Sequence, residues 1–322
     1  MARSSRVARR IMVIGALLAF STWLGAAPIG AENRDSDSAI GVAVPGLTVT
    51  TVSGEAFGGE AEIEITSNVT VRPSASAAAE AGGFDITALF DAVRTGDLTP
   101  FHDLLQSEGV AAAAAGAQHF EVGPEPDVEL PSDGGVRKES EDSLDLDVKG
   151  VKLPLAEDLH VETEGAIGDT GFARTEVDTE DTGGFTFFAK KLDTECRADL
   201  AGVEASTTID DGRQLDESGT NIVDMPEHPD ENEVLLDVTL EEVASPSLTI
   251  RVTAFLIANE QDDDPNAITV NGAREHFRVD FIDTLAPIAP TEFADFKATF
   301  AHAHCDVHPD PVVQVVEPTF TG

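Results

Sequence analysis

Tyrosine is absent from this chain of 322 residues, and its single tryptophan, Trp23, lies close to the N-terminus. Cysteine occurs only twice, and the 20 Lys and Arg residues face 60 Asp and Glu, for a formal net charge of −40. Nucleic acids and anionic membrane surfaces are bound mainly through Lys and Arg that neutralise phosphates. Both are therefore excluded as expected partners.

Long apolar runs are equally scarce. The sequence has one, and it lies at the N-terminus. Four arginines precede an uncharged apolar stretch from Ile11 to about Ala27, and the segment ends at Ala31. This pattern is typical of a secretory signal peptide. We expect cleavage after Ala31 and a secreted, extracellular protein, with tethering to a membrane by an uncleaved signal as the alternative.

The signal leaves the export route open, since the adjacent Arg9 and Arg10 fit either the general or the twin-arginine pathway. Residues 1–31 contain four of the arginines and no acidic residue, so the remaining chain carries a net charge of −44. Because 41% of all residues are hydrophobic, we expect an acidic globular protein, adapted to a saline or alkaline medium, rather than a disordered one. The sequence after residue 307 shows no apolar tail, so a soluble, released product is expected.

Apolar residues alternate with polar ones through most of the remaining chain, which predicts β-strands. Glycine, proline and asparagine pairs divide the pattern and predict turns, including Gly58-Gly59, Gly123-Pro124, Gly183-Gly184, Pro265-Asn266 and Asn271-Gly272. We divide the sequence into a signal peptide (1–31), an acidic lead-in (32–39), N-terminal strands (40–73), an Ala-rich helical insertion (74–118), a main β domain (119–307) and a tail (308–322).

Within the insertion, one short helix is predicted after Asp85 and a second is predicted with Thr99 as N-cap and Pro100 at its first position. The insertion either packs against the sheets or forms a partner-binding lobe. The many short strands favour an all-β fold, an antiparallel β-sandwich of Ig-like or jelly-roll-like type. A right-handed β-helix is the alternative, although no strict short repeat supports it.

An even number of cysteines in an exported protein predicts a disulfide, here between Cys196 and Cys305. The competing interpretation is a reactive Cys305 thiolate beside His304.

Several short motifs, in order, resemble the actinobacterial exported proteins called choice-of-anchor P. They are the segments 122–131, 196–208, 258–261, 268–271 and 301–307, and the resemblance covers roughly residues 115 to 307. It implies an exported β domain, often attached through a variable C-terminal anchor. It implies no activity, ligand or catalytic residue.

Metal ligands are the remaining candidates for a site. His302 and His304, two residues apart on a predicted strand, share one face and, with His308, could hold Zn²⁺ or Cu²⁺. The carboxylates of Asp262, Asp263 and Asp264 lie in a predicted acidic turn and could hold Ca²⁺. The alternatives without a bound metal are a partly exposed strand end for the histidines and a solvated acidic turn for the aspartates.

No common catalytic motif is found. We therefore expect a non-enzymatic exported protein of the cell envelope or medium with a structural, adhesive or interaction role and no cofactor. The partner, an envelope polymer or a protein, is not identified by the sequence, and neither is the oligomeric state. The alternative is a divalent-metal-binding protein or metal-dependent hydrolase that uses the histidines or the acidic turns, with Ca²⁺ or Zn²⁺.

Overall fold

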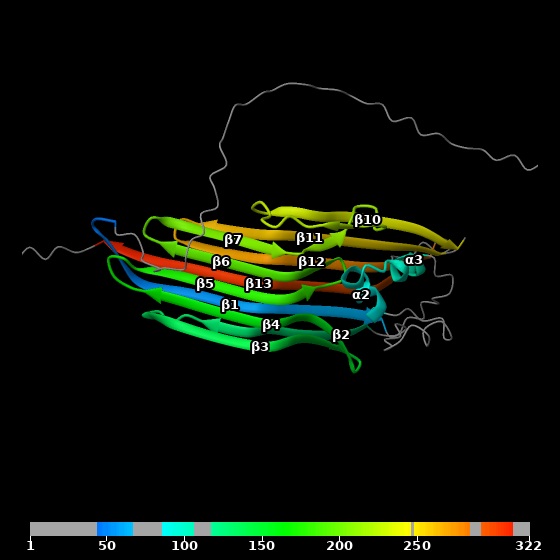
Figure 1. Ribbon diagram of the computed structural model, residues 1–322, viewed down its shortest axis with the longest axis horizontal. Helices are drawn as coiled ribbons and strands as arrows, with labels where there is room; N and C mark the ends of the chain where they lie inside the picture. The colour runs from blue at the N-terminus through cyan, green and yellow to red at the C-terminus, as the bar shows by residue number, and fades with distance from the viewer. Residues whose placement is uncertain (1–43, 67–85, 106–116, 246–247, 284–290, 312–322) are drawn as a thin grey trace, which may run out of the picture. The chain divides into compact units, whose positions relative to one another are not determined.

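A computed structural model describes residues 44–66, 86–105, 117–245, 248–283 and 291–311. The signal peptide and the acidic lead-in lie outside these residues. These ranges contain two short helices and thirteen strands, and Figure 1 shows their arrangement. The helices are α2 (Ile86–Thr95) and α3 (Thr99–Leu105). The strands are β1 (Leu47–Thr66), β2 (Ala117–Glu129), β3 (Gly134–Val148), β4 (Val151–Ala166), β5 (Phe172–Gly183), β6 (Phe187–Asp199), β7 (Gly202–Asp210), β8 (Arg213–Leu215), β9 (Ile222–Asp224), β10 (Glu233–Ser245), β11 (Leu248–Asp264), β12 (Ala267–Asp283) and β13 (Thr291–Pro311).

The strands form two antiparallel sheets that pack face to face. Sheet A has the order β10-β11-β12-β13-β1-β2, and sheet B has the order β3-β4-β5-β6-β8-β9, with β7 also paired to β6. The predicted antiparallel β-sandwich is therefore confirmed, and every strand pair is antiparallel, unlike those of a parallel β-helix. Strands β1 and β13 pair with one another inside sheet A, from Leu47 opposite Pro311 to Ile65 opposite Ala294. Strand β13 thus continues past the boundary predicted at residue 307.

The predicted disulfide is confirmed. It joins Cys196 of β6 to Cys305 of β13, with a Cα–Cα distance of 6.0 Å, and so links sheet B to sheet A. Both cysteines are fully buried, and the chain contains no free thiol. The reactive-thiolate interpretation of Cys305 is wrong.

The helical insertion packs against the sandwich through its apolar residues. In α2 the side chains of Ile86, Leu89, Phe90 and Val93 are buried, as their helical spacing predicts. Phe90 contacts Phe185 edge-on at 5.2 Å between ring centroids. The start of α3 differs from the prediction, in which Thr99 is the N-cap. The side chain of Asp97 has the capping role instead, because its carboxylate accepts a hydrogen bond from the Thr99 amide.

Three predicted turns are wrong, because they fall inside continuous strands. Gly58-Gly59 lies within β1, Gly123-Pro124 within β2 and Asn271-Gly272 within β12. A line across four strands of sheet A passes through two of these sites, and we call it the crease. On each strand that it crosses, two successive residues face sheet B, where strand alternation would allow only one. The residues of the crease are Gly58 and Gly59 in β1, Phe300 and Ala301 in β13, Gly272 and Ala273 in β12, and Ala258 and Asn259 in β11.

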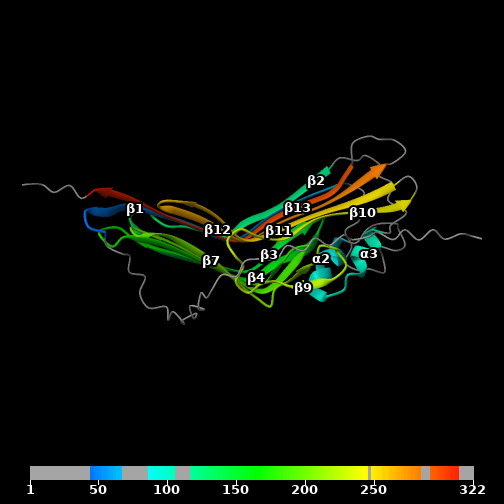
Figure 2. The same ribbon diagram turned by 90° about the horizontal axis from the view of Figure 1, so that it is seen from above.

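The register between strands is unbroken across the crease. In β1, β13, β12 and β11 the residue pairings on its two sides follow one another without a shift. Ala301 and Asn259 reach it in left-handed backbone conformations, with φ of 54° and 49°. A Cβ on Gly58 would lie 2.5 Å from Leu159 of sheet B, so glycine is required where the sheets approach. The strands of sheet A bend midway along their length, with the face turned away from sheet B on the inside of the bend (Figure 2).

Candidate functional site

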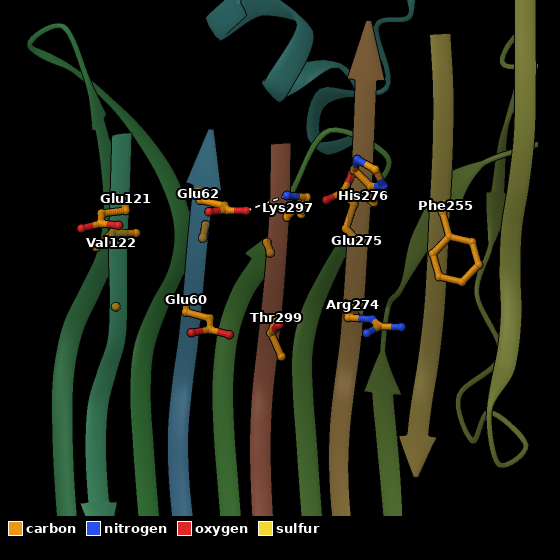
Figure 3. A pocket seen from close by; sticks show the side chains of 13 residues that line it. Glu60, Glu62, Glu121, Val122, Phe255, Arg274, Glu275, His276, Lys297 and Thr299 are labelled. Carbon is orange, nitrogen blue, oxygen red and sulfur yellow. Dashed lines mark hydrogen bonds and ion pairs between the residues drawn. The ribbon is translucent and has the colours of Figure 1, made fainter. Parts of the chain in front are cut away.

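A shallow groove lies on the outer face of sheet A, on the inside of its bend. Its volume is about 480 Å³, and Figure 3 shows residues of five neighbouring strands around it. We call it the outer groove. One row of its side chains crosses the sheet in direct register from Phe255 through His276, Lys297 and Glu62 to Glu121.

The alternation of strand residues sorts charges into two stripes along the groove. Arg274, His276 and Arg278 point outward from β12, while the intervening residues are buried. On β1 the outward residues are Glu60, Glu62 and Glu64. Strand β13 lies between them and contributes Asp295, Lys297 and Thr299. A basic stripe and an acidic stripe therefore run side by side.

Ion pairs cross the groove and fix several of these side chains. Lys297 donates to Glu62 at 2.8 Å, and His276 contacts Asp295 at 2.6 Å. The hydrogen bond from Lys297 lowers the pKa of Glu62, so this carboxylate is charged at neutral pH. Such exposed pairs stabilise a protein by only about 0–1 kcal/mol each. Their main consequence is a defined pattern of charge, in which Glu60 and Glu64 have no partner among the described residues.

The histidines predicted as metal ligands lie on the same outer face, on the far side of the crease. His302 stacks on Phe57 at 4.4 Å between ring centroids, and its Nδ1 bonds Asn271 Oδ1 at 2.7 Å. Burial, together with the neighbouring His304, lowers the pKa of His302 to about 4. His304 Nδ1 bonds Thr269 Oγ1 at 2.9 Å.

His308 does not join these two histidines in a ligand set, since its Nε2 contacts Asp306 at 3.0 Å. Among the residues that the structure describes, no group of three or more His, Cys, Asp or Glu is arranged to hold a metal ion.

The three aspartates predicted as a calcium site do not converge. They occupy the end of strand β11 rather than a turn, and Pro265-Asn266 form the turn that follows. Asp263 stands opposite Ile268, which is buried, whereas Asp262 and Asp264 stand opposite Thr269 and Ala267. Strand alternation therefore directs Asp263 to the other face of the sheet from its two neighbours.

Sequence reasoning missed one unusual carboxylic acid, Glu275 of β12, whose side chain is only 1% exposed. Its Oε1 accepts a hydrogen bond from the Thr186 amide at 2.7 Å, whereas its Oε2 has no partner among the described residues. Burial raises the pKa of Glu275 to about 7. The signal was present in the sequence, because Glu275 occupies the apolar phase of its strand, between Ala273 and Phe277.

No helix in the described ranges is both long and apolar enough to span a membrane. Comparison with known proteins gives no match to any family model, any curated protein or any solved structure.

Proposed function

We propose that this is an exported, non-enzymatic β-sandwich protein of the cell envelope or medium that binds a partner through the outer groove. The observation that carries the proposal is the row of side chains in register across five strands, from Phe255 to Glu121. A groove that is open along a sheet face fits an extended partner better than a compact small molecule, which is usually enclosed by a pocket.

Export is supported by two independent features. The N-terminal sequence has the order of a secretory signal peptide, and disulfides persist mainly in oxidising compartments. The resemblance to the choice-of-anchor P proteins agrees with an exported β domain and remains a hypothesis about family.

The charge pattern suggests the chemistry of the partner. Basic and acidic stripes lie about two strand spacings apart, since β13 separates β12 from β1, which corresponds to roughly 10 Å. A polypeptide segment or an envelope polymer that carries both charges can match this pattern, whereas a polyanion meets the acidic stripe and the chain's overall charge of −40. The groove thus favours a zwitterionic or polypeptide partner.

Cosedimentation tests this proposal. Purified residues 32–322 are mixed with the envelope fraction of the source organism, and the bound fraction is measured at several salt concentrations. Binding should fall at least about tenfold for the double variant Arg274→Glu with Lys297→Glu, because it replaces two cationic side chains of the groove with anionic ones. The matched control, Lys138→Glu with Lys152→Glu, reverses two exposed lysines of sheet B and should bind like the wild type. Equal loss in both variants, or no binding of the wild type, contradicts the proposal.

A second candidate function, metal binding, is favoured by the arrangement of His302 and His304. Both Nδ1 atoms are held by side chains of β12, as metal-ligating histidines are commonly held, and this leaves each Nε2 as the ligand atom. Calorimetry with Zn²⁺ and with Cu²⁺ tests this alternative. Heat of binding that disappears in His302→Ala and His304→Ala supports it, and a wild type without binding excludes it.

A further inference from the structure

We propose that Glu275 acts as a pH-sensitive latch. As the pH rises towards neutrality, its ionisation increases the population in which the helical lobe is open while the disulfide-bonded half of the sandwich stays closed. By helical lobe we mean α2, α3 and the turn at residues 183–186, which cover one end of the core.

The carboxyl group of Glu275 is buried beneath the turn at residues 183–186. Oε1 accepts the hydrogen bond from the Thr186 amide, and Oε2 lies directly against Gly184, where a side chain would collide with it. The two helices cover the turn and the neighbouring ring of β12 through their phenylalanines. Phe185 of the turn stacks on Phe277 at 4.9 Å between ring centroids, Phe90 of α2 contacts Phe185, and Phe101 of α3 meets Phe277 edge-on at 5.9 Å.

Among the residues that the structure describes, no cation compensates the buried carboxylate. The effects on its pKa are burial and hydrogen bonds from Thr186 and Phe185, without a charged contributor. The outward residues of β11, β12 and β13 lie on the opposite face of sheet A, and Asp181 pairs with Lys190 beside the turn. The charged and titratable groups on the surrounding elements include Arg251, Arg274, His276, Arg278, Asp280, Asp295, Lys297, Asp181, Lys190, Asp91, Arg94, His102, Asp103 and Arg213.

Ionisation makes the enclosure unfavourable, because a charge in apolar surroundings is strongly destabilised unless it is paired or hydrated. Water reaches the carboxylate most readily if the helical lobe moves away, since β12 is held on both edges by its pairing with β11 and β13. The disulfide restrains the other half, because Cys305 follows the crease at Ala301 whereas Glu275 is paired with Ala298 before it. Opening is therefore expected at the helical end alone.

Hydrogen exchange with mass spectrometry tests the latch. Amide exchange is compared at pH 6.0 and 8.5 after correction for the intrinsic pH dependence of exchange. In the wild type, peptides that cover 86–105 and 183–187 should exchange about tenfold faster at pH 8.5, because opening increases about tenfold per pH unit up to the pKa of about 7 and no further above it. Peptides from 301–311 should not change.

Glu275→Gln should remove the difference, and the exposed control Glu64→Gln should retain it. Glu275→Met serves as a second variant if the glutamine variant does not fold. The latch is refuted by pH-dependent exchange that persists in these Glu275 variants, by its absence in the wild type, or by equal acceleration at residues 301–311.

Discussion

Replacing both cysteines by alanine, Cys196→Ala with Cys305→Ala, removes the covalent link between sheet A and sheet B. The two residues are 109 positions apart in the sequence, and a crosslink over about 100 residues restricts the unfolded chain by roughly 4.7 kcal/mol in the chain-entropy model. Measured losses for native disulfides are about 2–5 kcal/mol. We expect the free energy of unfolding to fall by an amount in that range.

Urea denaturation of residues 32–322 measures this loss. Circular dichroism is the appropriate probe, because the segment contains neither tyrosine nor tryptophan. The dependence of the free energy on urea should steepen, since an unfolded chain without the crosslink exposes more surface. Wild-type protein unfolded in reductant serves as the control and should match the double variant. A loss below about 1 kcal/mol would refute the reasoning that the bridge stabilises the fold through the unfolded state.

Three further predictions concern the core, the buried acid and the surface charge. Phe90→Ala should lower the free energy of unfolding by about 3–5 kcal/mol, measured by urea denaturation, because the ring is 1% exposed; a change below 1 kcal/mol contradicts its packing role. Folding raises the pKa of Glu275 from 4.5 to about 7, so its contribution to stability is present below pH 4.5 and is lost as the pH rises to 7. Urea denaturation of the wild type should show the free energy of unfolding falling by roughly 3 kcal/mol between pH 4.5 and 8, a loss that Glu275→Gln lacks. Identical pH profiles of stability in the two proteins contradict this prediction. Melting temperature should rise from low to molar NaCl, because salt screens a net charge of −40; no rise favours a basic partner instead.

Local sequence patterns were sufficient to predict the sandwich and the first helix, because both depend on periodicity. Alternation marks the strands, and the spacing of Ile86, Leu89, Phe90 and Val93 marks α2. The disulfide followed from an even cysteine count and an export signal.

The crease was not predicted, since glycine pairs such as Gly58-Gly59 are typical of turns. Their role inside β1 depends on how closely Leu159 and Leu144 of sheet B approach, and these contacts join residues distant in the sequence. The outer groove escaped prediction for the same reason. Glu62 and Lys297 face one another only because β1 pairs with β13, 235 residues away.

Carboxyl-group labelling of the envelope-bound protein tests most directly whether the outer groove is the binding face. Exposed carboxylates are coupled to an amine with a water-soluble carbodiimide. Mass spectrometry then compares the labelling of the free protein with that of the bound protein. Binding should protect Glu60 and Glu121 of the groove and leave the exposed Glu204 of sheet B labelled as before. Unchanged labelling of the two groove residues, with protection at Glu204, would contradict the proposed function.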